Sequence, residues 1–169
     1  GQNRLVALAQ RALDKFLLNK GEYHARAEEI NDRSLSWLDS IDDDQPFFLW
    51  NHYMDPHGPY NPPAGYTYAN RELSNDEAQK LYQKTIDHPG EITEDGRQLL
   101  IDAYDGEIRY LDDQLRTFFD ALDDRGLLEE SLIFVTADHG DAFGEHSYYT
   151  HPRYLHESLL HVPLIVSLP

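Results

Sequence analysis

Residues 132–140 read LIFVTADHG, and this stretch decides which fold we expect the sequence to adopt. It opens with consecutive apolar residues from Leu132 to Val135, and so short a run predicts a strand buried on both faces of a parallel sheet. Asp138 and His139 follow shortly after, and Gly140 lets the backbone turn sharply away from them. Because ligands bind beyond the carboxyl ends of the strands in open parallel sheets, Asp138 and His139 are candidates for a functional site.

Helical and strand-like segments alternate on both sides of this strand. Apolar residues at steps of three and four predict helices over residues 4–17, 24–40, 74–86 and 93–122. Ser74, with Glu77 three residues later, has the pattern of a capping box at the start of the third of these helices. Apolar runs at 47–50 and 163–168 predict two further buried strands. The alternation predicts an α/β fold, with a mainly parallel sheet flanked by helices, in a single domain over residues 1–169.

The composition is strongly acidic, with 31 acidic and 14 basic residues and a formal net charge of −17. Such a surface repels phosphate backbones and anionic lipid headgroups, which argues against nucleic-acid and membrane-surface binding. The excess of carboxylates fits a halophilic source, and an ordinary acidic cytosolic protein is the alternative. The absence of cysteine excludes disulfides and thiolate metal ligands. No apolar run reaches the roughly 18 residues of a membrane span, and with no export signal visible we favour a cytoplasmic location.

Asp138 and His139 place a carboxylate and an imidazole side by side, which is half of a divalent-metal site. In the purely structural alternative, Asp138 caps the following segment and His139 bonds to a backbone carbonyl. The density of polar residues that follow favours the metal site: Asp141, Glu145, His146 and His151.

A second candidate region follows the apolar run at 47–50. His57 lies between Pro56 and Gly58 in a proline-rich loop, which suits a side chain that is presented to a ligand. His52, at the end of the expected strand, fits a core histidine as well as it fits a ligand.

Three segments in this order resemble the sulfatases of the alkaline phosphatase superfamily: PFFLWNHYMDPHGPY at 46–60, FVTADHGDAFGEH at 134–146 and HPRYLHESLLHVP at 151–163. The resemblance covers residues 25–169. It implies an alkaline-phosphatase-like layered fold and hydrolysis of small-molecule or carbohydrate sulfate esters.

The resemblance also implies roles for individual residues. Asp138 and His139 match the second pair of ligands of the family's divalent cation, which is usually Ca²⁺. His57 matches the histidine that binds the sulfate group, and His151 falls where relatives have a lysine or histidine that contacts sulfate and the leaving oxygen. Arg153 is the alternative to His151, because the alignment can slide at this point.

The family's nucleophile, a formylglycine made from cysteine or serine in a Cys/Ser-x-Pro/Ala-x-Arg motif, has no counterpart in this sequence. We therefore expect the chain to be the C-terminal part of a catalytic domain, carrying half of the metal site and inactive by itself. Missing strands would leave apolar sheet surface exposed and favour self-association. Two alternatives stay open: a phosphodiesterase or phosphonate monoester hydrolase of the same superfamily, and a non-catalytic acidic domain that binds cations.

Overall fold

The computed structural model describes residues 24–42 and 45–169. The helix expected over residues 4–17 therefore lies outside the described residues. None of the described helices is long and apolar enough to cross a membrane.

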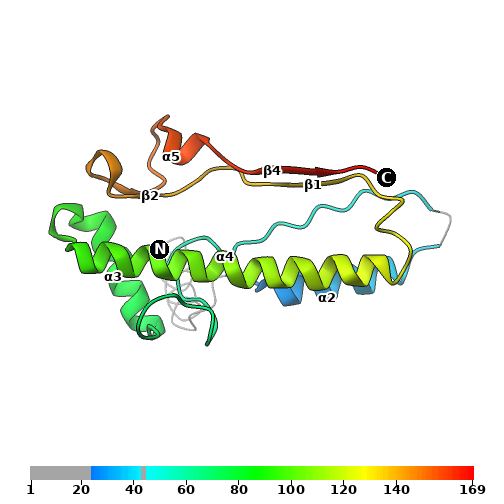
Figure 1. Ribbon diagram of the computed structural model, residues 1–169, viewed down its shortest axis with the longest axis horizontal. Coiled ribbons are helices and arrows are strands. Elements are labelled where there is room, and N and C mark those ends of the chain that lie inside the picture. Colours follow the sequence, from blue (N-terminus) through cyan, green and yellow to red (C-terminus); the bar gives the residue numbers. More distant parts are fainter. Residues whose placement is uncertain (1–23, 43–44) are drawn as a thin grey trace, which may run out of the picture.

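A single long helix, α4 (Glu94–Asp123), runs the length of the molecule and carries the other elements (Figure 1). Its first turn is capped by Thr93, whose Oγ1 accepts a hydrogen bond from the backbone N–H of Gly96 at 3.2 Å. Helix α2 (Ala27–Leu38) lies alongside the C-terminal half of α4, and Leu38 packs there with Phe118 and Leu122. This apolar cluster holds the two helices together.

The N-terminal half of α4 is covered by helix α3 (Asn75–Asp87) and the short helix η1 (Pro89–Glu91). The capping box expected from the sequence is confirmed, because Ser74 Oγ accepts from the N–H of Glu77 while the Glu77 carboxylate accepts from the N–H of Ser74. A second core cluster forms here around Tyr60, Leu100 and Ala103. It fixes the loop that leads away from His57 onto the long helix.

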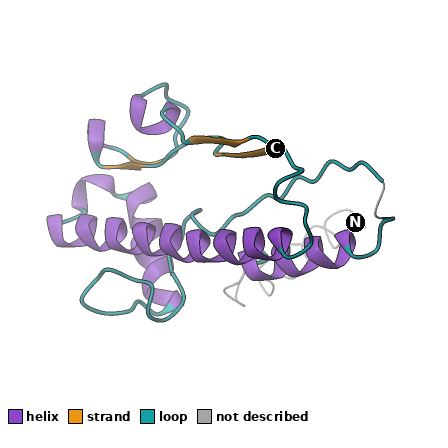
Figure 2. Ribbon diagram, turned by 45° about the vertical axis from the view of Figure 1, so that its right-hand side comes forward, coloured by secondary structure: helices purple, strands orange, loops and turns teal. Residues whose placement is uncertain are grey.

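The strands form two separate two-stranded sheets (Figure 2). Strand β1 (Ile133–Thr136) pairs with β4 (Leu164–Ser167), and β2 (Ala142–Phe143) pairs with β3 (Tyr149–Thr150). Between these strands lie η2 (Glu145–Ser147) and α5 (Glu157–Leu160).

Both pairings are antiparallel, so the mainly parallel sheet expected from the sequence is not found among the described strands. Residues 47–50, expected to form a strand, are extended but lie outside both sheets. The physical reason is that a short apolar run indicates only a buried, extended segment. Which strand it pairs with, and whether that pairing is parallel or antiparallel, is set by residues far away in the sequence.

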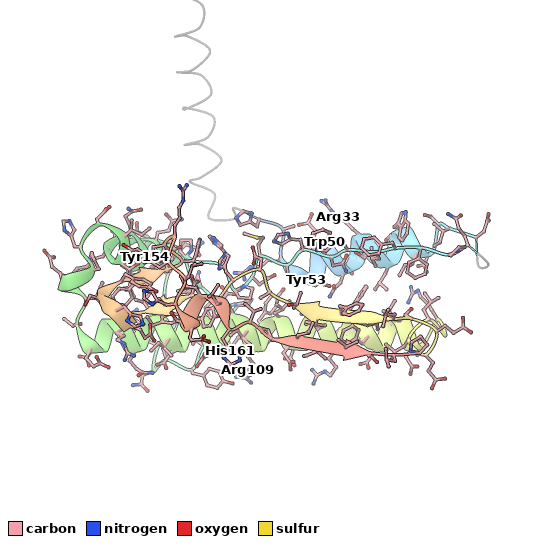
Figure 3. All side chains as sticks on the ribbon, turned by 90° about the horizontal axis from the view of Figure 1, so that it is seen from above. Arg33, Trp50, Tyr53, Arg109, Tyr154 and His161 are labelled. Carbon is pink, nitrogen blue, oxygen red and sulfur yellow. The ribbon has the colours of Figure 1, made fainter. Side chains whose placement is uncertain are left out.

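The apolar strands are also more exposed than the prediction of strands buried on both faces requires. Phe134 on β1 is 60% exposed and Trp50 on the extended segment is 77% exposed. Figure 3 shows Trp50 on this segment and Tyr53 shortly after it. Apolar surface is left uncovered at Trp50, Phe134, Phe48, Ile165 and Val166. Exposed apolar sheet surface was expected from the sequence.

Candidate functional site

Three histidines from different parts of the chain converge at one end of the long β1–β4 ribbon. His57 comes from the proline-rich loop, His139 from the turn after β1, and His151 from the residue after β3. The ring centroids of His139 and His151 are 4.3 Å apart, and those of His57 and His151 are 5.1 Å apart. The fold therefore brings together the predicted metal ligand His139 and the two predicted sulfate-binding histidines.

Each of these rings is oriented through its Nδ1 atom. His57 Nδ1 lies 2.7 Å from the carbonyl oxygen of Gly58, and His139 Nδ1 lies 2.9 Å from that of Gly140. His151 Nδ1 lies 2.8 Å from Oδ1 of Asp141. Because carbonyl and carboxylate oxygens only accept hydrogen bonds, each Nδ1 is the protonated nitrogen, and the lone pair of each neutral ring lies on Nε2.

Asp141 is the residue that joins this cluster to the protein core. Its side chain is only 5% exposed, and its Oδ2 accepts a hydrogen bond from the hydroxyl of Tyr60 at 2.6 Å. Tyr60 is itself buried, and burial together with the neighbouring Asp141 carboxylate raises the pKa of the Tyr60 hydroxyl well above its ordinary value. From the sequence, Asp141 was one of several polar residues after the expected strand, with no role of its own. The signal that could have found it was its position in the run from Asp138 to His151.

The turn after β1 depends on a glycine. The N–H of Gly140 donates to the carbonyl oxygen of Leu159 at 2.9 Å. A Cβ atom at this position would lie 2.2 Å from the carbonyl oxygen of Ser158. Only glycine lets the turn after His139 pack this closely against α5, which places the imidazole beside that of His151.

Asp138 occupies a different position from Asp141. Its side chain is 78% exposed, and its Oδ2 lies 3.8 Å from Nε2 of His139. Two ligands that each lie about 2.0–2.5 Å from one cation can be separated by this distance. Asp138 and His139 are thus close enough to bind one cation together, and their roles as ligands stay a prediction.

Two further residues predicted from the sequence as possible site residues are exposed. Arg153 is exposed on the segment that follows His151. His52 is exposed as well, so it is not a core histidine.

A pocket adjoins the cluster on the side of His57, and it contains a buried ion pair that sequence reasoning missed. It is lined by His57 with Arg26, Asp55 and Glu107, among other residues. Arg26 donates to Oε2 of Glu107 at 2.8 Å, and the N–H of Asn61 donates to Oε1 at 3.0 Å. Burial raises the pKa of Glu107 to about 7 even though Arg26 lowers it. This pair anchors the loop that carries His57 to α4.

The family model and two curated relatives that match this chain are sulfatases. The family model described as Sulfatase matches residues 9–169. The chain is 30% identical to an arylsulfatase of Clostridium perfringens over 131 residues, which is 71% of this chain and 27% of the relative. It is 33% identical to the iduronate 2-sulfatase of Mus musculus over 118 residues, which is 68% of this chain and 20% of the relative.

One further curated relative and one solved structure are also similar to this chain. The multifunctional alkaline phosphatase superfamily protein PehA of Trinickia caryophylli is 29% identical over 163 residues, or 81% of this chain and 31% of that protein. A protein solved in complex with its substrate D-glucosamine-2-N,6-O-disulfate has a TM-score of 0.64 at 19% identity, covering 88% of this chain and 44% of that protein. The chain thus spans less than a third of the length of each of these curated relatives.

Proposed function

The chain belongs to the sulfatase family, and from this premise we propose that it forms part of the catalytic domain of a hydrolase that cleaves sulfate esters. The observation that carries the proposal is the convergence of His57, His139 and His151, since these side chains come from segments far apart in the sequence. Small-molecule and carbohydrate sulfate esters are the proposed substrates. The structural neighbour with a bound sulfated sugar supports this substrate class.

In the proposed reaction the histidines act on the ester itself. Cleavage of a sulfate ester develops negative charge on the bridging oxygen and keeps charge on the non-bridging oxygens. His151 in its protonated form donates a hydrogen bond from Nε2 to the leaving oxygen, while Asp141 holds its Nδ1 and so fixes the ring. His57 contacts the sulfate group, and Arg153 is the alternative to His151 on the same segment.

A divalent cation fits the proposal, with Ca²⁺ as the expected ion and Asp138 and His139 as its ligands in this chain. When bound, it supplies positive charge to the non-bridging sulfate oxygens. Asp138 and His139 form only half of such a site, so the remaining ligands come from other parts of the enzyme. The nucleophile, expected to be a formylglycine, is also supplied from outside this sequence, and the isolated chain is inactive.

A phosphodiester or phosphonate ester is the second candidate substrate. The specific observation in its favour is the 29% identity to the multifunctional alkaline phosphatase superfamily protein PehA, which covers most of this chain. The contacts proposed for His57 and His151 are to the non-bridging oxygens and the leaving group, and these groups occur in sulfate and phosphonate esters alike.

The test is a comparison of 4-nitrophenyl sulfate with 4-nitrophenyl phenylphosphonate as substrates of the full-length enzyme that contains this chain. We expect the sulfate ester to be hydrolysed faster, and a His151→Asn variant to lose on the order of 10²-fold or more in kcat. His88→Asn is the matched control, because His88 is exposed next to η1. Faster hydrolysis of the phosphonate would support the second candidate substrate. If neither ester is hydrolysed, the hydrolase proposal is contradicted in favour of a non-catalytic, cation-binding domain.

A further inference from the structure

We propose that Arg26 is a positioning residue for His57, because its guanidinium group fastens both ends of the loop that presents the imidazole to sulfate. This loop, the His57 loop, comprises residues 55–61. The inference rests on the proposed function, since it gives Arg26 a part in sulfate binding that is exerted through His57. Arg26 itself touches neither the sulfate group nor the leaving oxygen in this proposal.

A single guanidinium group contacts the two ends of the His57 loop. At the start of the loop, Nη1 of Arg26 lies 3.4 Å from Oδ1 of Asp55. At its end, Nη2 of Arg26 donates a hydrogen bond to the carbonyl oxygen of Asn61 at 2.9 Å. Because the guanidinium is planar and its N–H groups point in fixed directions, the two contacts together set the distance between the ends of the loop.

Two helices hold this arrangement in place. Glu107 on α4 accepts a hydrogen bond from Nη1 of Arg26 through Oε2 at 2.8 Å, and its Oε1 accepts from the N–H of Asn61 at 3.0 Å. Ala27 is the first residue of α2, and its N–H donates to Oδ1 of Asp55 at 3.3 Å. Both ends of the His57 loop are therefore fixed relative to α2 and α4.

Inside the loop, His57 is held by its neighbours. Its N–H donates to the carbonyl oxygen of Met54 at 3.0 Å, and its Nδ1 lies 2.7 Å from the carbonyl oxygen of Gly58. A Cβ atom at Gly58 would lie 2.1 Å from the ring of Tyr82, so the loop packs closely against α3. The imidazole therefore moves with the loop, and the two ends that Arg26 joins decide where the loop lies.

The burial of this network favours positioning as its role. The side chains of Asp55 and Glu107 are 0% and 2% exposed, and that of Arg26 is 34% exposed. Because charges lose their hydration on burial, a buried ion pair is often no more stabilising than apolar side chains of the same volume. Apolar contacts already join α2 to α4 at Leu38 and Phe118. Such contacts cannot select one carbonyl oxygen and two carboxylates, as the guanidinium of Arg26 does.

The experiment uses the variant Arg26→Lys in the full-length enzyme that contains this chain. Lysine keeps the charge, but its single ammonium group cannot reproduce the fork that contacts two carboxylates and a carbonyl oxygen together. We expect KM for 4-nitrophenyl sulfate to rise about tenfold and kcat to change by less than about threefold, because His57 binds sulfate in the substrate and in the transition state alike. Arg33→Lys is the matched control on α2, since the Arg33 side chain is 76% exposed and pairs with Glu29 of the same helix.

A double-mutant cycle separates positioning of His57 from a merely structural role. If Arg26 acts through His57, then Arg26→Lys should raise KM by less than about twofold in a His57→Ala background. The same tenfold increase in both backgrounds would overturn the proposal. An unchanged KM in the single variant Arg26→Lys would overturn it as well.

Hydrogen exchange followed by mass spectrometry tests the loop without turnover. In Arg26→Lys we expect the amides of residues 54–61 to exchange at least about tenfold faster, whereas unchanged exchange in the C-terminal half of α4 shows that the variant is folded. Unchanged exchange in the His57 loop would overturn the proposal. If the unaltered enzyme hydrolyses no ester, the proposed function is contradicted, and faster exchange of the loop in Arg26→Lys still supports the role of Arg26 in holding it.

Discussion

The hydroxyl of Tyr60 donates a hydrogen bond to Oδ2 of Asp141 at 2.6 Å, joining residues 81 positions apart in the sequence. Oδ1 of the same carboxylate accepts from Nδ1 of His151 at 2.8 Å. A continuous line of hydrogen bonds thus runs from a buried tyrosine to an imidazole that faces solvent. The orientation of His151 is therefore coupled to the packing of Tyr60 against α4.

Replacing Tyr60 by phenylalanine tests this coupling. The ring keeps its packing, but the buried Asp141 carboxylate loses one of its two hydrogen bonds, so we expect the free energy of unfolding to fall by about 1–3 kcal/mol. Urea unfolding followed by circular dichroism measures this change. Tyr68→Phe is the matched control, because Tyr68 is 60% exposed and its ring contact with Arg109 does not need the hydroxyl. Equal stability of both variants would contradict the assigned role of Tyr60.

Glu107 should make the stability depend on pH. Burial raises its pKa in the folded protein from 4.5 to about 7, so between these values the folded state holds a proton that the unfolded state has released. The contribution of Glu107 to the free energy of unfolding is therefore largest at or below about pH 4.5. This contribution falls by on the order of 3 kcal/mol as the pH rises through 7.

The variant Glu107→Gln should remove most of this slope between pH 4.5 and pH 7 in urea unfolding experiments. Asp55, whose pKa burial also raises, should leave a smaller slope in the same direction. The exposed Glu129→Gln serves as the control for the same chemical change. A slope that is unchanged in Glu107→Gln would show that this carboxyl does not hold the proton.

Gly140→Ala should disrupt the turn that carries His139. The new Cβ would lie 2.2 Å from a backbone oxygen of Ser158, and backbone cannot move aside as a flexible side chain can. We expect a loss of about 2–3 kcal/mol in unfolding free energy. Gly90→Ala is the control, because no atom lies within 4 Å of a Cβ built there. Thermal unfolding of the two variants provides the comparison, and similar stability of both would contradict the close packing of Gly140.

The exposed face of the β1–β4 ribbon should drive self-association. Phe134 and Val166 are directly paired across the two strands, and they are 60% and 46% exposed. Sedimentation velocity over a range of concentrations should show oligomers that shrink in a Phe134→Lys, Val166→Lys double variant. Ile86→Lys, at an exposed apolar position on α3, should leave the distribution unchanged. A monomer at all concentrations would refute the association.

The helices were largely predictable from the sequence. Expected limits of 24–40, 74–86 and 93–122 correspond to Ala27–Leu38, Asn75–Asp87 and Glu94–Asp123 in the structure. The reason is that apolar periodicity and capping are local properties, encoded within a few residues of each helix end. The residues of the candidate site were proposed from their local context and the family resemblance: Asp138, His139, His57 and His151. The structure places the three histidines close together.

Which strands pair and which side chains contact one another was decided only by the tertiary structure. The sequence identified the apolar runs at 132–135 and 163–168, but their antiparallel pairing depends on the path of the chain between them. The role of Asp141 depends on its contacts with Tyr60 and His151, and the contact of His57 with His151 joins two loops that lie far apart in the sequence. Sequence thus determined the family, the helices and the types of side chain available for chemistry. Tertiary structure determined which of these side chains meet, because contacts between distant residues follow from the packing of the whole chain and are not encoded in any one segment.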